Sequence, residues 1–284
     1  MSLLIEPSFW EIAKNYRVIM FDAFGVLKNS HGIIEGVPDT VARFREAGIA
    51  SYVLTNDASR SPQEMEKTYT HARHGALIPA THIVSSGMLA SEFLALKVRS
   101  GPVGYIGKEA SAHYVRVAGL EPIPVDRVTD PDSLRAFCLL DDEGFDWFLD
   151  INRAVNLLRR VNIPIVVANT DIAYPIDADD VAVAVGSLAN MMEGIVRKTF
   201  IRFGKPDTQI FSFAYARVRE AIPDIKKNEV LMVGDTLTTD IIGANKFGID
   251  SALVLSGNTQ RSRADVMIQA SGIIPTFVFD SVRT

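Results

Sequence analysis

The sequence predicts an α/β protein with a doubly wound parallel sheet as its core and a second α/β unit inserted into that core. The first observation is an apolar run at 17–21 that ends at Asp22 and is followed by Gly25. An unbroken apolar run bounded by a turn signal is typical of a strand buried in a parallel sheet. The second observation is the regular alternation of such runs with amphipathic helical segments. The third is a similar run at 230–233, followed by Gly-Asp at 234–235.

Turn and capping residues define the first elements. Ser8 is a suitable N-cap for an amphipathic helix, and the turn cluster at 29–32 predicts a short hairpin. Pro38 and Gly48 bound the next helix, because proline is favoured in the first helical turn and glycine just beyond the last. The expected order is a helix over 9–16, a strand over 17–21, a hairpin within 28–36, a helix over 38–47, a strand over 49–54 and a helix over 61–75.

From about Ser85 the alternation starts again, which predicts a second α/β unit with its own apolar periodicity. Its expected elements are helices over 89–98, 109–118, 151–161 and 186–197, and apolar strand patterns over 103–106, 136–140, 163–168 and 181–185. The acidic run 141–143 after the second of these strands is interpreted as a solvated turn. We therefore expect a core domain formed by 1–84 and 201–284, with the inserted unit over 85–200.

The C-terminal part returns to the core sheet. The segment 200–205 precedes a helix over 208–221, and the strand 230–233 precedes a helix over 238–247 that Gly248 ends. Strands over 251–255 and 274–279 complete the sheet. The connections between neighbouring strands have lengths suited to right-handed parallel crossovers.

Composition narrows the classes of partner. The 284 residues carry a formal charge of −5, so no basic excess is present to neutralise a nucleic-acid backbone or an acidic membrane surface. No apolar stretch approaches the roughly 20 residues needed to span a bilayer. The segment 1–7 lacks a cationic region followed by a long apolar core, so it does not resemble a signal peptide. We expect a cytoplasmic protein with no nucleic-acid and no membrane partner.

Several chemically reactive side chains lie at the ends of predicted strands or in the loops that follow. They are Asp22, Thr55, Lys205 and Asp235, with Asp240 one turn into the next helix. Ligands of open α/β sheets bind beyond the carboxyl ends of the strands. Converging carboxylates form an oxygen-only site that suits Mg²⁺, and a hydroxyl and a lysine would hold phosphate oxygens. Asp22 could then attack phosphorus and form an aspartyl-phosphate.

These residues stand in an order that resembles the four motifs of the haloacid dehalogenase (HAD) superfamily. The matching segments are DAFGVL (22–27), LTN (54–56), GKP (204–206) and GDTLTTD (234–240). The segments TNDASRS (55–61), NTD (169–171) and TDIIGAN (239–245) resemble its class IIA branch, the NagD-like and 4-nitrophenylphosphatase-like sugar phosphatases. Only 33 positions separate Asp22 from Thr55, whereas 150 separate Thr55 from Lys205. The resemblance therefore implies a C2-type cap domain in the second interval.

The resemblance also implies roles for these residues in a Mg²⁺-dependent phosphatase that acts on a small phosphorylated metabolite, such as a sugar phosphate. Asp22 would be the nucleophile and a metal ligand, together with the Phe24 backbone carbonyl, Asp235 and Asp240. Thr55 and the Asn56 backbone would bind phosphate, and Lys205 would orient nucleophile and phosphate. Asn169 and Asp171 would shape the cap side of the pocket. The family relation further implies a homodimer formed through the cap.

One position departs from the family pattern. HAD phosphatases carry a second aspartate two residues after the nucleophile, where it protonates the leaving oxygen, and this sequence has Phe24 there. General acid–base help contributes about 10²–10⁴-fold, so we expect slow turnover of alkyl phosphates unless another group, with His31 as the candidate, carries the proton. A phosphate-binding protein with little turnover is the first alternative. A 2-haloacid dehalogenase, whose first motif has an aromatic residue at this position, is the second.

Overall fold

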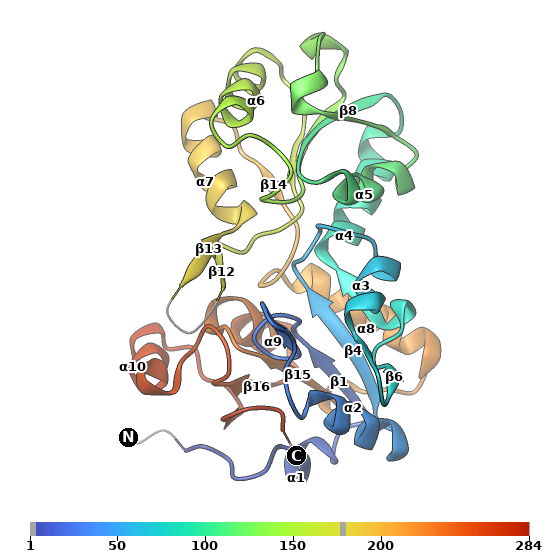
Figure 1. Cartoon of the computed structure of the whole chain (residues 1–284), viewed down its shortest axis with the longest axis vertical. Coiled ribbons are helices and arrows are strands. Elements are labelled where there is room, and N and C mark those ends of the chain that lie inside the picture. The colour runs from blue at the N-terminus through green and yellow to red at the C-terminus, as the bar shows by residue number, and fades with distance from the viewer. Residues whose placement is uncertain (1–3, 177–179, 284) are drawn as a thin grey trace.

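Two parallel sheets, each covered by helices, form the structure, a computed structural model that describes residues 4–176 and 180–283 (Figure 1). Residues 1–3, part of the segment expected not to be a signal peptide, lie outside this range. The six-stranded sheet occupies the lower half of Figure 1, and the five-stranded sheet the upper half. Among the described residues, no helix combines the length and apolar character that a bilayer crossing requires.

The lower sheet is parallel throughout and has a topological switch point at its centre. Its strands in spatial order are β17 (Phe277–Phe279), β16 (Asp250–Val254), β15 (Val230–Gly234), β1 (Val18–Phe21), β4 (Ala50–Thr55) and β7 (Ile83–Ser85). From β1 the chain builds outward through β4 and β7, and later it builds in the opposite direction from β15. The crevice between β1 and β15 is therefore where this fold class binds its ligands.

Side chains of β1 alternate between two apolar layers, which explains why the run 18–21 is continuously apolar. Ile19 and Phe21 pack with α1 (Phe9–Ala13), α2 (Val37–Glu46) and α3 (Pro62–Thr68). Val18 and Met20 belong to the layer that contains α4 (Ser86–Phe93), α8 (Thr208–Ala221) and α9 (Ile242–Phe247). Both faces are thus covered, as expected for a doubly wound sheet.

The upper sheet lies within the inserted part of the chain. Its parallel strands in spatial order are β14 (Ile201–Arg202), β11 (Ile165–Val167), β10 (Ala136–Leu139), β8 (Pro102–Ile106) and β9 (Glu121–Pro124). Its helices are α5 (His113–Val117), α6 (Leu149–Arg160) and α7 (Val185–Val196). The chain proceeds from β8 outward to β9, and from β10 in the other direction to β11 and β14. This sheet therefore has a second switch point, between β8 and β10.

Short elements complete the structure. Within residues 4–176 and 180–283, antiparallel strand pairs are formed by β2 (Lys28–Asn29) with β3 (Gly32–Ile33), β5 (Thr70–His71) with β6 (Gly75–Ala76), and β12 (Ala173–Pro175) with β13 (Val181–Val183). Single 3₁₀ turns span Ala80–His82, Glu109–Ala112, Val125–Arg127, Pro131–Ser133 and Lys227–Glu229, and π turns span Leu94–Val98 and Leu237–Ile241. The last helix, α10, spans Arg261–Ser271. The hairpin of β12 and β13 lies between the two sheets in Figure 1.

Most of the expected elements are present, and the differences have local causes. The helix expected over 61–75 ends at Thr68, because the chain then turns into a hairpin in which Gly75 has φ +67°. Strand β7 is missing from the sequence prediction, since three residues are too few to show a periodicity. Helix α10 is also missing from it, because only Ala264 of this helix is buried and no apolar stripe marks it.

Candidate active site

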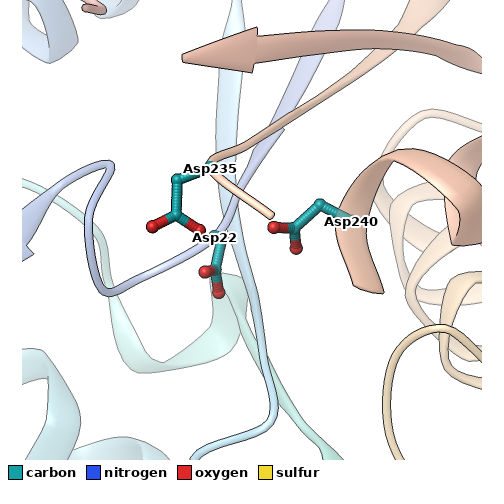
Figure 2. Close-up of side chains that lie close together, drawn as sticks. All are labelled: Asp22, Asp235 and Asp240. Atoms are coloured by element: carbon teal, nitrogen blue, oxygen red, sulfur yellow. The ribbon is translucent and has the colours of Figure 1, made fainter. Parts of the chain in front are cut away.

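The switch point of the lower sheet brings two aspartates from distant parts of the chain together. Phe21 lies in register with Val233, so Asp22 and Asp235 leave neighbouring strands at the same edge. The Asp22 amide still donates to the Val233 carbonyl at 2.8 Å, which fixes where the side chain begins. One carboxylate oxygen from each of Asp22, Asp235 and Asp240 lies within 4.8 Å of the others (Figure 2).

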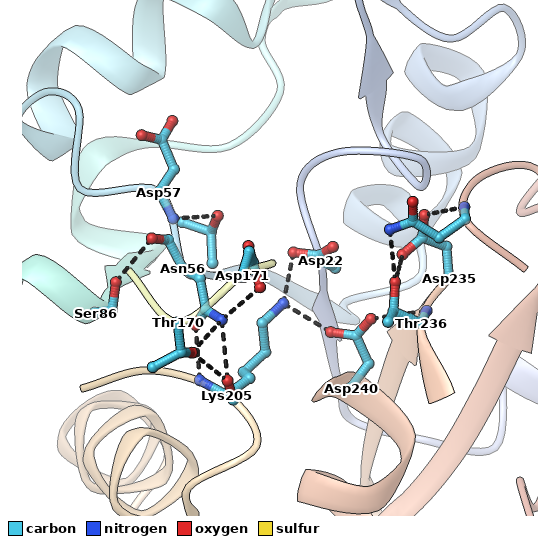
Figure 3. A network of polar contacts seen from close by, with 12 residues as sticks. Asp22, Asn56, Asp57, Ser86, Thr170, Asp171, Lys205, Asp235, Thr236 and Asp240 are labelled. Carbon is cyan, nitrogen blue, oxygen red and sulfur yellow. Dashed lines mark hydrogen bonds and ion pairs between the residues drawn. The ribbon is translucent and has the colours of Figure 1, made fainter. Parts of the chain in front are cut away.

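Lys205 is the cation that faces these carboxylates. Its side chain is only 2% exposed, and its Nζ donates to Asp22 Oδ1 at 2.6 Å and to Asp240 Oδ1 at 2.7 Å (Figure 3). Burial alone would lower the pKa of Lys205, but the charges of Asp22 and Asp240 outweigh burial and raise this pKa above its ordinary value. The lysine is therefore a permanent ammonium group beside Asp22.

Asp240 and Asp235 are each held by donors of the loops around them. Asp240 accepts from the Thr236 amide through Oδ2, while its Oδ1 faces Lys205. Asp235 accepts from the Thr236 hydroxyl at 2.7 Å and from the Asn258 amide at 2.7 Å. Burial, and then the nearby charge of Asp22, raise the pKa of Asp235.

These carboxylates fit a hard divalent cation. Three acidic groups meet beside Lys205, which pairs with Asp22 and Asp240, so acidic groups outnumber the lysine that is paired with them. Oxygen donors of this kind suit Mg²⁺, which binds through one or two carboxylates and keeps waters and substrate oxygens. In the turn after Asp22, the carbonyls of Ala23 and Lys28 accept the hydrogen bonds. These bonds leave the Phe24 carbonyl free to bind a cation.

Asn56 joins the loop after β4 to the lysine loop and to the inserted unit. Its Oδ1 accepts from the Lys205 amide at 2.7 Å, and its Nδ2 donates to the Lys205 carbonyl, Thr170 Oγ1 and Asp171 Oδ1 (Figure 3). The side chain of Asn56 is thus fully used in positioning its neighbours. The Thr55 hydroxyl accepts from the Asp57 amide at 3.1 Å and lines the cavity above Asp22.

The cavity above Asp22, of about 200 Å³, lies between the carboxyl edges of the two sheets. The lower sheet contributes Asp22 and Thr55 to its lining, and the upper unit contributes Asn169 and Asp171. Burial raises the pKa of Asp171 to about 6. The sequence analysis missed further lining residues of the upper unit, namely Lys108, Asp141, Asp142 and Tyr174.

The acidic run 141–143 is not the solvated turn expected from the sequence. Asp141 and Asp142 are only 6% and 9% exposed, because they follow β10 directly into the cavity. The signal that could have found them is the rule that identified Asp22, namely a carboxylate just beyond a buried parallel strand.

Residue 24 and His31 occupy different surroundings. The Phe24 ring lines the cavity and lies edge-on to the Tyr174 ring, with 5.9 Å between ring centroids. His31 is exposed and lines a separate cavity with Pro175 and Ile176, so the expectation that it serves Asp22 is wrong. The reason is that the hairpin of β2 and β3 presents its turn toward β12, where Ser30 donates to the Ile176 carbonyl.

Two glycines make room for the Asp235 carboxylate, and one of them offers a clean test of the packing. A methyl group at Gly257 would lie 1.9 Å from Asp235 Oδ2, which two donors already fix. We expect Gly257→Ala to lower the free energy of unfolding by about 1–3 kcal/mol, measured by urea denaturation. Gly194→Ala in α7 meets nothing within 4 Å and is the control, expected to stabilise by up to about 1 kcal/mol. Equal stability of the two variants would contradict this packing.

Comparison with known proteins agrees with this fold and site. Residues 19–121 match the family model of haloacid dehalogenase-like hydrolases, and residues 202–284 match a HAD-hydrolase-like model. A structure from Cytophaga hutchinsonii, described as a possible sugar phosphatase of the HAD superfamily, is 47% identical, with coverage of 100% of this chain and 99% of that one and a TM-score of 0.93. Chronophin from Mus musculus is 28% identical over 272 residues, which cover 93% of this chain and 90% of that protein.

A glycerol phosphate phosphatase from Mycobacterium tuberculosis, solved in complex with calcium, is 26% identical, with a TM-score of 0.75 and coverage of 96% of this chain and 75% of that one. The fold, the strand-end carboxylates and the inserted second α/β unit together define a class of hydrolases with a doubly wound core and a cap. This chain belongs to the haloacid dehalogenase superfamily. The family resemblance inferred from the sequence motifs is confirmed.

Proposed function

We propose that this chain is a Mg²⁺-dependent phosphatase that hydrolyses a small phosphorylated metabolite through an aspartyl-phosphate at Asp22. The observation that supports this proposal is the buried Lys205 ammonium, 2.6 Å from Asp22 Oδ1, at the switch point of the lower sheet. A lysine in this position pairs with the nucleophile Asp22 and attracts the anionic phosphoryl group. The relatives described as phosphatases, of sugar phosphate and of glycerol phosphate, support the substrate class.

Each residue of the site has a role in this proposal. Asp22 attacks phosphorus, and Lys205 orients both the nucleophile and the phosphate. The Thr55 hydroxyl and the backbone N–H of Asn56 bind phosphate oxygens. Asp22, Asp235 and the Phe24 carbonyl would hold the cation, with Asp240 as a ligand directly or through water; the bound cation would neutralise charge on the phosphoryl group.

The inserted unit, residues 85–200 with the edge strand β14, acts as the cap in this proposal. Asn169 and Asp171 from this unit line the same cavity as Asp22, and in this proposal they contact the bound substrate. The Phe24 and Tyr174 rings meet at the junction of the two units and limit the entry of water. Exclusion of water strengthens every electrostatic interaction in the site.

A metal-dependent assay with 4-nitrophenyl phosphate tests this proposal. Its leaving group needs little protonation, so we expect hydrolysis in Mg²⁺ in spite of the phenylalanine at position 24. A chelator should abolish the activity and added Mg²⁺ should restore it. Hydrolysis that is equally fast in chelator would contradict the metal role. Chloride release from 2-chloropropionate without metal would instead favour a dehalogenase.

The second candidate function is binding of a phosphorylated ligand with little turnover. The Phe24 side chain favours it, because an aromatic ring can neither donate a proton to a leaving oxygen nor accept one from water. If no phosphate ester is hydrolysed while a beryllium fluoride complex still forms at Asp22, this candidate replaces the phosphatase. A fluorine NMR signal that Asp22→Asn removes would identify that complex.

A further inference from the structure

We propose that Asp141 of the inserted unit is the general acid and base that this chain uses in place of the residue at position 24. This inference rests on the phosphatase function proposed above. It assigns a catalytic role to a side chain that follows the central strand of the upper sheet, whereas Asp22 follows a strand of the lower sheet.

The topology of the two sheets places Asp141 opposite Asp22. Asp22 follows β1 at the switch point of the lower sheet, and Asp141 follows β10 at the switch point of the upper sheet. Both side chains line the same cavity of about 200 Å³. In phosphoryl transfer the attacking and leaving oxygens are roughly in line, so the leaving oxygen lies on the side of phosphorus that faces away from Asp22. In the proposed geometry, Asp141 meets the leaving oxygen from the upper-sheet side of the cavity.

The hydrogen bonding of Asp141 leaves one oxygen available to a ligand. Its Oδ1 accepts from the Asp142 amide at 2.9 Å, whereas its Oδ2 is buried and has no hydrogen-bond partner among the described residues. The nearest cation, Lys108 Nζ, is 3.9 Å from Oδ2, beyond hydrogen-bond distance, and is paired with Glu143 at 2.6 Å. A buried polar atom without a partner is unfavourable unless a ligand or water completes it.

Three other acidic groups of the cavity each have one oxygen held by a hydrogen-bond donor. The Oδ2 of Asp142 accepts from the Tyr174 hydroxyl at 3.0 Å. Asp57 accepts from the Ser59 amide at 2.8 Å, and Asp171 accepts from the Asn56 side chain. The carboxylates of Asp142, Asp57 and Asp171 have no buried oxygen without a hydrogen-bond partner among the described residues. Asp141 is the one cavity carboxylate whose buried oxygen has no hydrogen-bond donor among residues 4–176 and 180–283.

The protonation of Asp141 suits this role. The charged groups that face it are Lys108 after β8, Asp57 after β4, and Asp142 and Glu143 of its own loop. Burial is the largest influence, and together with the neighbouring aspartates it outweighs Lys108, so the pKa of Asp141 rises to about 6. A general acid is effective when its pKa lies near the working pH.

The proposed cycle balances in two steps. Asp22 attacks phosphorus, the bond from phosphorus to the ester oxygen breaks, and that oxygen takes the proton of Asp141, so an alcohol leaves and Asp141 becomes a carboxylate. Water then attacks the aspartyl-phosphate and gives its proton to Asp141 while the bond from phosphorus to Asp22 breaks. Hydrogen phosphate leaves, and both aspartates return to their starting states.

The test compares glycerol 3-phosphate, whose alkoxide leaving group needs a proton, with 4-nitrophenyl phosphate, whose leaving group does not. Asp141→Asn should lower the ratio of kcat/KM for glycerol 3-phosphate to that for 4-nitrophenyl phosphate by about 10²-fold or more. In the unmodified protein, kcat/KM for glycerol 3-phosphate should fall as the pH rises above about 6, because Asp141 loses its proton there. This falling limb should be absent in Asp141→Asn.

Two further variants separate a proton donor from a structural group. Asp142→Asn removes the neighbouring carboxylate of the same cavity and should leave the substrate ratio within about threefold of its starting value, because the Asp142 Oδ2 is occupied by Tyr174. Phe24→Asp in the Asp141→Asn background restores an acid at the usual position and should recover hydrolysis of glycerol 3-phosphate.

Equal losses on both substrates in Asp141→Asn, no loss on either, or the same pattern in Asp142→Asn would each overturn the assignment. The assignment would also be overturned if the unmodified protein hydrolysed 4-nitrophenyl phosphate in Mg²⁺ and did not hydrolyse glycerol 3-phosphate. In all of these outcomes the phosphatase function stands. Absence of metal-dependent hydrolysis of either ester would refute the phosphatase function and this inference together.

Discussion

Replacing Asp22 by asparagine should abolish the Mg²⁺-dependent hydrolysis of 4-nitrophenyl phosphate. An amide oxygen is a poor nucleophile, and it cannot form the ion pair that Asp22 Oδ1 makes with Lys205 at 2.6 Å. Loss of a covalent nucleophile lowers kcat by about 10⁴–10⁶-fold in well-studied hydrolases, so we expect activity at or below the detection limit. Steady-state kinetics with release of 4-nitrophenolate measure this directly.

The control for this variant is Asp265→Asn, which removes a half-buried carboxylate of α10 that accepts a hydrogen bond from Gln269 and does not line the cavity above Asp22. It should retain full activity. Thermal unfolding of Asp22→Asn should be cooperative, so that the loss of activity reports on chemistry and not on folding. If Asp22→Asn retained more than about a hundredth of the activity, Asp22 would not be the nucleophile.

Replacing Lys205 by methionine should both inactivate and destabilise the protein. Lys205 is 2% exposed and contacts Asp22 and Asp240, of which Asp240 is fully buried. Removal of one partner from a buried ion pair leaves uncompensated charge and destabilises by about 3–5 kcal/mol. Without its ammonium partner, Asp240 would stay protonated in the folded state at a pH where the unfolded chain releases that proton.

This difference gives the pH dependence of the Lys205→Met variant a defined sign. A carboxyl group whose pKa is higher in the folded state makes stability fall as pH rises. Urea unfolding should therefore show a larger deficit at about pH 8 than at about pH 5. Lys205→Met with Asp240→Asn should recover part of the loss, and Lys97→Met, at an exposed position, should change little. A deficit independent of pH would mean that packing, and not charge, is lost.

The core sheet could be predicted because its central strands are apolar runs that end at carboxylates. The same rule placed Asp22 and Asp235 at one edge, and the register of β1 with β15 shows why two positions so far apart in the chain meet. Lys205 and Asp240 can be identified from the spacing of the sequence motifs. Their ion pair is visible only in the three-dimensional structure.

Other features depend on how the two sheets face each other, which local periodicity does not encode. Asp141 reads as a turn residue in sequence and becomes a cavity residue because the upper sheet directs its carboxyl edge toward the lower one. His31 reads as a candidate acid because it follows Asp22 closely, but its hairpin turns toward Ile176. The short strand β7 is fixed by pairing with β4 and by no pattern of its own.

Tyr114 limits how far the two halves of this molecule can be exchanged as separate modules. It belongs to α5 of the inserted unit, yet its hydroxyl contacts Ser85 Oγ and donates to the Arg60 carbonyl, and its ring fills the space that a methyl group at Gly87 would need. A different insert grafted onto this core to change its specificity must therefore keep Tyr114 together with the residues that it contacts. A chimera that keeps the contacted residues and lacks the tyrosine would have a cavity where the Tyr114 ring now packs.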